Sequence, residues 1–332
     1  MTPRSRRRKH AISQLNLMVV GFKSLGKTSF IRMLFDTLRI RREDNIQLPA
    51  SLFQTAEKPG DAEAASTKEL YSFTLDVEEE NEKISLTLVD CPGFIKDNEL
   101  RLDVQVTEAL RYIEAQFDLT LAEETKVKRN PKALDSQIHA CLYFIDNANN
   151  GLTDKDIRIL KRLTARVNVI PVVAKADLLT TSQLANLKKT INRDLKFHQI
   201  PVFEFAEAEE DTDIDQELED GEEQEQTASS FQSMIPFSLI APEDAIITDP
   251  NTSERIRGRQ FPWGIIDCLN PKHCDFVVLR NVLLTSHRKL FKDRTLESFY
   301  EQYRTERLLA RKASKMITKE QKKKLLEDLS EI

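Results

Sequence analysis

The most informative stretch of the sequence is Gly21-Phe-Lys-Ser-Leu-Gly26-Lys27-Thr28, which fits the phosphate-binding pattern GxxxxGK[ST]. An apolar run at residues 15–20 comes before it, and a helical pattern with apolar residues on one side comes after it. This order predicts a strand, a loop and a helix. Backbone N–H groups at the start of the helix would bind phosphate oxygens, while Lys27 adds a positive charge and Thr28 a ligand for Mg²⁺.

The rest of the chain alternates between strand-like and helix-like segments. Strands are predicted at 70–77, 83–89, 140–145, 167–174, 202–205 and 234–240, and helices at 99–125 and 154–166. The first two of these strands are separated by Asn81-Glu82 and predict a hairpin. The alternation predicts an α/β fold of the P-loop GTPase kind, with a mostly parallel sheet and helices on both faces.

A second nucleotide element follows the strand predicted at 83–89. It reads Asp90-Cys-Pro-Gly93 and begins 63 residues after Lys27. Asp90 can hold the shell of an Mg²⁺ ion, and the N–H group of Gly93 can face a γ-phosphate. Many β-turns have a similar composition, so the position directly behind an apolar strand is what favours a nucleotide site.

A third element, Ala174-Lys175-Ala176-Asp177, ends the strand predicted at 167–174. Asp177 can accept two hydrogen bonds from the N1–H and the exocyclic amine of guanine. Adenine lacks these donors, and a buried acceptor left unpaired costs about 1–3 kcal/mol. An ordinary aspartate at a strand end would explain this motif alone. After the first two motifs in this order, selectivity for GTP is the better interpretation.

Composition and charge exclude several classes of protein. Hydrophobic residues make up 40% of the chain, and no apolar run approaches the roughly 20 residues that cross a bilayer. The four cysteines form no CxxC pair, so reduced thiols are expected. The net charge of the chain is −5, and residues 206–226 contain twelve acidic and no basic residues. We expect 206–230 to be a disordered acidic insert, and we expect no nucleic-acid partner.

The nucleotide motifs resemble those of the small-GTPase superfamily, and three later stretches resemble the septin family in particular. These stretches are Arg257-Gly-Arg-Gln-Phe-Pro-Trp-Gly264, His273-Cys-Asp-Phe-Val-Val-Leu-Arg-Asn281 and Tyr300-Glu-Gln-Tyr303. The similarity runs from about residue 16 to residue 307. It implies a septin-type GTP-binding domain at 15–307, whose septin unique element lies at 257–307. A basic extension at 1–14 and a basic helix or tail at 308–332 would flank this domain.

The resemblance also implies which residues bind GTP or GDP together with Mg²⁺. In septins the P-loop holds the phosphates, the third motif holds guanine, and an arginine equivalent to Arg259 reaches the base. The predicted nucleotide-binding residues are Gly21, Lys23, Ser24, Gly26, Lys27, Thr28, Ser29, Gly93, Lys175, Asp177, Ala241 and Arg259, and the predicted metal ligands are Thr28 and Asp90. Thr67 falls in the register of the septin threonine that holds the attacking water, so it is the predicted catalytic residue.

The likeness to septins further implies partners and a location. Septins form hetero-oligomers and filaments through a G interface across the nucleotide, where Trp263 would lie, and through an N/C interface. We therefore expect a cytoplasmic scaffold at the cell cortex, septum or division site. A basic stretch near the start resembles the septin segment that binds phosphoinositides, and each such residue adds about 1 kcal/mol on an anionic membrane. These residues are Arg4, Arg6, Arg7, Arg8 and Lys9.

The sequence departs from the septin pattern at both switches and near the base. Ser24 and Ala241 stand where septins have glycines, and the second switch, which ends at Lys96, lacks a glycine and an acidic residue of the usual pattern. We therefore expect slow or absent GTP hydrolysis, and a specialised subunit that needs other septins to polymerise. A regulatory GTPase switch is the alternative. A P-loop kinase or ATPase is disfavoured by the motif at 174–177.

Overall fold

The computed structural model describes residues 13–38, 70–79, 82–128, 134–205, 231–243, 247–248 and 255–330. Three predictions fall outside these residues: the catalytic role of Thr67, the basic residues between positions 4 and 9, and the acidic insert at 206–230.

A six-stranded sheet forms the centre of the molecule, in the order β2-β3-β1-β4-β5-β6. The strands are β1 (Ser13–Gly21), β2 (Tyr71–Glu79), β3 (Glu82–Asp90), β4 (Ala140–Ile145), β5 (Val169–Val173) and β6 (Phe237–Ser238). Only the β2–β3 hairpin is antiparallel, and all other neighbours in this sheet run parallel. β1 is buried along most of its length, as expected for a parallel strand covered on both faces. The predicted fold class is confirmed.

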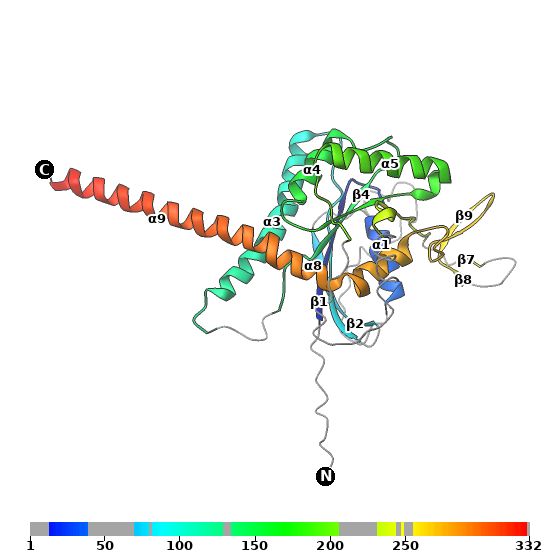
Figure 1. Ribbon diagram of the computed structural model, residues 1–332, viewed down its shortest axis with the longest axis horizontal. Coiled ribbons are helices and arrows are strands. Elements are labelled where there is room, and N and C mark those ends of the chain that lie inside the picture. Colours follow the sequence, from blue (N-terminus) through cyan, green and yellow to red (C-terminus); the bar gives the residue numbers. More distant parts are fainter. Residues whose placement is uncertain are drawn as a thin grey trace, which may run out of the picture.

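Helices cover both faces of this sheet (Figure 1). On one face α1 (Lys27–Thr37) packs against α7 (Phe276–Asn281), where the rings of Phe30 and Phe276 lie 5.9 Å apart. The helices α3 (Glu99–Glu124) and α4 (Asp154–Leu163) form another neighbouring pair. The side chain of Arg162 on α4 donates a hydrogen bond of 2.8 Å to Thr107 on α3. The single turn η1 (Ala176–Leu178) and the helix α5 (Thr181–Phe197) follow β5.

The remaining elements follow β6. They include two small antiparallel ladders, β7 (Ile247–Thr248) with β8 (Arg255–Ile256), and β9 (Gly258–Phe261) with β10 (Gly264–Asp267). After α7 the chain continues through η2 (Val282–Ser286), α8 (Arg288–Arg294), η3 (Thr295–Tyr300) and α9 (Glu301–Ser330). In Figure 1 the far end of α9 projects well beyond the body of the molecule. A helix was predicted from residue 308 onward, but α9 already begins at Glu301, inside the predicted domain.

One strand prediction was wrong and another was too long. Residues 202–205 form no strand, although Phe203 donates one backbone hydrogen bond of 2.9 Å to Val169. Their apolar character reflects an aromatic cluster, in which the ring of Phe203 lies 4.4 Å from that of Phe291. The strand predicted at 234–240 shrinks to β6, because the side chain of Asn192 binds the carbonyl of Ile235 at 2.7 Å.

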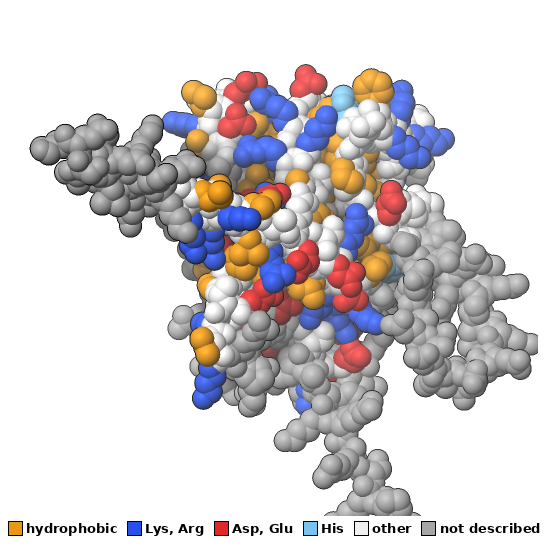
Figure 2. All heavy atoms as spheres, turned by 60° about the vertical axis from the view of Figure 1, so that its left-hand side comes forward, with side chains coloured by type: hydrophobic (Ala, Val, Ile, Leu, Met, Phe, Trp, Pro, Cys, Tyr) orange, Lys and Arg blue, Asp and Glu red, His pale blue; other side chains and the backbone are white. Residues whose placement is uncertain are grey.

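Ion pairs fix the first turns of α9 against α3. Arg307 lies 2.6 Å from Asp118, and Arg304 lies 3.4 Å from Glu124. Arg166 adds contacts to both helices, at 3.0 Å from Glu114 and 2.6 Å from Glu306. The side of the molecule that Figure 2 turns forward shows basic and acidic side chains interspersed with apolar ones.

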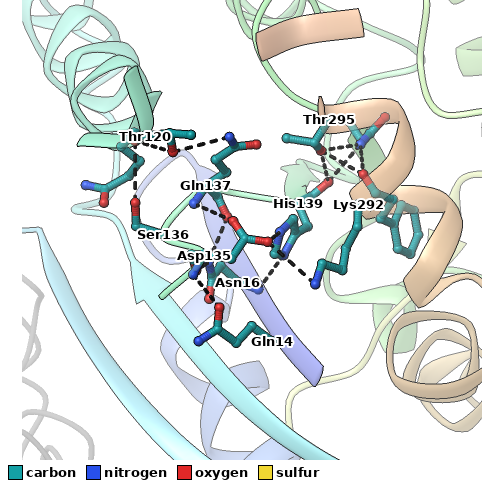
Figure 3. A network of polar contacts seen from close by, with 12 residues as sticks. Gln14, Asn16, Thr120, Asp135, Ser136, Gln137, His139, Lys292 and Thr295 are labelled. Atoms are coloured by element: carbon teal, nitrogen blue, oxygen red, sulfur yellow. Dashed lines mark hydrogen bonds and ion pairs between the residues drawn. The ribbon is translucent and has the colours of Figure 1, made fainter. Parts of the chain in front are cut away.

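A buried polar network closes the end of the sheet opposite the P-loop (Figure 3). The Nδ1 atom of His139 accepts a hydrogen bond of 2.9 Å from the backbone N–H of Asn16, so its Nε2 carries the proton. This Nε2 lies 3.0 Å from the carboxylate of Asp135, which Lys292 also approaches at 3.5 Å. The amide of Asn168 donates to the His139 carbonyl at 2.8 Å. The network therefore ties β1 and β4 to α8.

We expect His139→Phe to destabilise the chain, because it keeps a ring in place but leaves the buried N–H of Asn16 without an acceptor. The expected loss is about 1–3 kcal/mol in the free energy of unfolding, measured by urea titration followed by circular dichroism. His198→Phe, at the half-buried C-terminal end of α5, serves as the control and should change it by less than about 0.5 kcal/mol. Equal losses in both variants would contradict this role for His139.

Candidate functional site

The phosphate-binding loop connects β1 to α1 as predicted. Gly26 adopts a left-handed conformation with φ 82° and precedes the first turn of α1, which contains no acidic residue. The free N–H groups of this turn and the helix dipole favour an anion. Ser24 also has a left-handed φ, of 61°. Septins have a glycine at this position, and the left-handed conformation costs the serine about 1 kcal/mol.

Lys27 lies inside this loop and is 6% exposed. Its Nζ donates to the carbonyl oxygens of Gly21 at 3.0 Å and Phe22 at 2.8 Å. Burial lowers the pKa of Lys27 to about 8, although the charge of Asp90 acts in the opposite direction. The ammonium group is thus held by carbonyl groups at the position where phosphate oxygens would compete for it.

The two predicted metal ligands meet at the end of β3. The hydroxyl of Thr28 donates to Asp90 Oδ2 at 2.8 Å, although the residues are 62 positions apart. A hydroxyl and a carboxylate are hard oxygen donors that suit Mg²⁺. Among the described residues there is no group of three or more His, Cys, Asp or Glu side chains that could hold a metal. This donor set fits Mg²⁺, which commonly takes its other ligands from phosphates and water.

The second switch lies directly against the P-loop. A Cβ atom on Gly93 would lie 2.6 Å from the Cα of Lys23, so only glycine fits at this position. A methyl group on Gly26 would similarly lie 3.2 Å from the Cβ of Ala241. The structure therefore places Ala241 beside the P-loop. Ser29 lies half-buried in the first turn of α1.

The part of the site that would bind the guanine base lies at the carboxyl ends of β5 and β6. The side chain of Asp177 is fully buried, and its Oδ2 accepts a hydrogen bond of 2.8 Å from Arg259. Its Oδ1 is buried without a hydrogen-bond partner. Guanine carries two adjacent donors, so the unsatisfied oxygen together with an exchangeable Arg259 contact fits a guanine base.

Arg259 extends this site toward the surface. Its guanidinium lies 5.5 Å from the ring of Phe261, and this ring stacks on Trp263 with centroids 4.7 Å apart. Arg259 and Phe261 lie on β9, and Trp263 lies in the turn between β9 and β10. Trp263 is 76% exposed. One continuous set of contacts thus runs from the buried Asp177 to an exposed aromatic surface.

Two polar residues that the sequence analysis missed follow β4. The amide of Asn147 donates to the carbonyl of Lys175 at 2.8 Å and supports its left-handed conformation, with φ 53°. Asp146 binds Lys96 of the second switch at 2.5 Å. The available signal was their position directly after a buried parallel strand next to β1, where ligands of such sheets bind. Thr67 stays a prediction because it lies outside the described residues.

The fold and these motifs define a P-loop GTP-binding protein of the α/β class. A model of the Septin family matches residues 12–316 of the chain. The chain is 37% identical over 297 residues to the septin homolog spn3 of Schizosaccharomyces pombe, covering 89% of this chain and 73% of that protein. It is 32% identical to septation protein 7 of Candida albicans over 89% of this chain, but only 48% of that relative is matched.

A solved structure extends the comparison to the fold. The crystal structure of the septin GTPase domain from Chlamydomonas reinhardtii has a TM-score of 0.62 at 20% identity, and the match covers 89% of this chain and all of that one, 100%. The chain belongs to the septin family. It is therefore a guanine-nucleotide-binding protein with a septin cytoskeletal role in cell division.

We expect nucleotide affinity to fall as the pH rises through the pKa of Lys27, which is about 8 when the site holds no phosphate. Phosphate charge raises this pKa, so the bound form keeps a proton that the unbound form loses. Affinity should then fall by up to about tenfold per pH unit above this value. Calorimetry in two buffers with different ionisation enthalpies would show the proton uptake. Lys27→Arg, which stays charged, should abolish it, and equal uptake in both proteins would contradict the assignment.

Proposed function

We propose that this septin is a subunit of hetero-oligomers and filaments, made with other septins, that lie on anionic membrane. GTP or GDP with Mg²⁺ is mainly a structural ligand in this role, and hydrolysis is slow or absent. The chain works as a scaffold at the cell cortex, septum or division site. A relative named septation protein 7 supports the link to division. The changes at the switches and near the base support a specialised subunit that polymerises only with other septins.

One observation carries the proposal most strongly, the line of contacts from Asp177 through Arg259 and Phe261 to Trp263. A nucleotide base bound at Asp177 would order Arg259, and Arg259 would order the hairpin. An exposed tryptophan beside a stacked aromatic ring is the kind of anchor that dominates protein interfaces. The guanine site and a docking surface would therefore form together.

Each residue of the pocket has a proposed task. Lys27 and the N-terminus of α1 neutralise phosphate charge, and Gly93 lets the second switch approach the P-loop. Thr28 and Asp90 hold Mg²⁺, which would neutralise charge on the phosphates when bound. The remaining nucleotide contacts would come from the P-loop and base-side residues Gly21, Lys23, Ser24, Gly26, Ser29, Lys175 and Ala241. Thr67 is the proposed residue for holding an attacking water.

A second interface is proposed on the side where α9 crosses α3. Leu308 and Leu309 on α9 are exposed, and so is Leu119 on α3. Ion pairs join these two helices, so the two apolar sets lie on neighbouring elements. Alternation of this N/C interface with the G interface would produce rods.

Membrane contact is proposed for the basic residues ahead of β1, each contributing about 1 kcal/mol on an anionic leaflet. These are Arg4, Arg6, Arg7, Arg8 and Lys9. Within the described part of the chain, no helix combines the length and the apolar character needed to cross a bilayer.

We expect Trp263→Ala to leave the folding and nucleotide content of the isolated chain unchanged, because the ring is mainly exposed. Association with partner septins should weaken by about thirtyfold, since interface tryptophans account for about 2 kcal/mol. Sedimentation velocity of mixtures with partner septins at low salt would measure this. The control is Phe197→Ala, whose ring is 80% exposed at the end of α5. Equal association of both variants would contradict the proposed interface.

A further inference from the structure

The second-switch segment, residues 93–96, is bonded to the backbone of the P-loop. Phe22 and Phe94 form a parallel β-bridge. The N–H of Lys23 donates to the Phe94 carbonyl, and the N–H of Phe94 donates to the Gly21 carbonyl, both at 3.1 Å. The rings of Phe22 and Phe94 pack edge to face, and both side chains are buried. The segment thus extends the P-loop as a short ladder.

Lys96 joins this ladder to two further elements. Its Nζ lies 2.5 Å from Asp146 Oδ2, at the carboxyl end of β4, and 5.2 Å from the centroid of the Phe22 ring. Lys155 of α4 donates to the backbone carbonyl of Lys96 at 2.6 Å. Although partial burial acts in the opposite direction, the contact with Lys96 keeps the pKa of Asp146 below its ordinary value. The carboxylate of Asp146 therefore stays charged at neutral pH.

A second helix, α3, contacts the middle of the segment. The N–H of Ile95 donates to Gln105 Oε1 of α3 at 3.0 Å. The second-switch segment therefore has protein partners on the P-loop, β4, α4 and α3. In GTPases that act as switches, contacts to the γ-phosphate order this segment, and hydrolysis releases it. The partners found here are protein groups that are present with either nucleotide.

We propose that Lys96 is a positioning residue that fixes the second switch on the P-loop in both the GTP-bound and the GDP-bound chain. The assembly surface next to the nucleotide then keeps one conformation after the γ-phosphate is lost. This inference rests on the proposed function, in which the nucleotide is a structural ligand. Lys96 stands at a position where the usual septin pattern is acidic. Because of its contacts, the conformation of the second switch would not depend on whether GTP or GDP is bound.

Hydrogen–deuterium exchange of residues 92–98 in the full chain tests this inference, with GDP compared with a non-hydrolysable GTP analogue. The wild-type segment should exchange at rates within about twofold of each other in the two forms. Lys96→Gln should raise exchange in the GDP form by about fivefold, because the loop loses its ion pair. Reversing the pair, with Lys96→Asp and Asp146→Lys, should restore protection. Lys189→Gln, on the exposed side of α5, is the control and should have no effect.

Two outcomes would overturn the inference. One is a several-fold difference in exchange between the GDP and GTP-analogue forms of the wild type. The other is an unchanged segment in Lys96→Gln. Nucleotide binding and association with partner septins, measured on the same samples, keep this result separate from the proposed function. If nucleotide binding and association are both normal, the proposed function stands even when the inference about Lys96 fails. A chain that binds neither GDP nor the GTP analogue would contradict the proposed function and the inference together.

Discussion

The contact between Asp177 and Arg259 is the constraint on which the functional part of the structure depends. A fully buried carboxylate without a partner is costly, so a donor must meet it. Arg259 satisfies one oxygen from a hairpin 82 positions further along the chain, and the other oxygen has no hydrogen-bond partner. The site is therefore stable enough to form and still lacks the donors that guanine provides. The same contact fixes the hairpin that carries Trp263 at the edge of the pocket.

The central sheet holds the two ends of the molecule in a fixed relation. The carboxyl ends of its parallel strands provide the P-loop, Asp90 and the third motif. The opposite end is closed by the network around His139, and α9 leaves the domain beside α3, where ion pairs fix it. Because β1 contributes both Gly21 and Asn16, the nucleotide pocket and the network share one rigid strand. This arrangement suits a subunit that joins neighbours at two surfaces.

Local motifs predicted the elements that frame the candidate site, because each motif carries its own geometry. The loop from Gly21 to Thr28 predicted a strand, a turn and a helix start, and the structure has all three. Contacts between distant segments could not be predicted in this way. The pairing of Lys96 with Asp146 joins residues 50 positions apart that have no shared motif. The segment at 202–205 was mistaken for a strand, because an apolar run reports burial and not the hydrogen bonds that the backbone makes. The predicted fold class, by contrast, needed only the alternation of elements.

The central claim is that bound guanine nucleotide completes the assembly surface. The most direct measurement is the association of this chain with partner septins, followed by sedimentation, after the nucleotide has been stripped and then restored. We predict that the stripped chain associates poorly, and that GDP and GTP restore association to the same extent. A stripped chain that associates as well as the loaded chain would contradict the account.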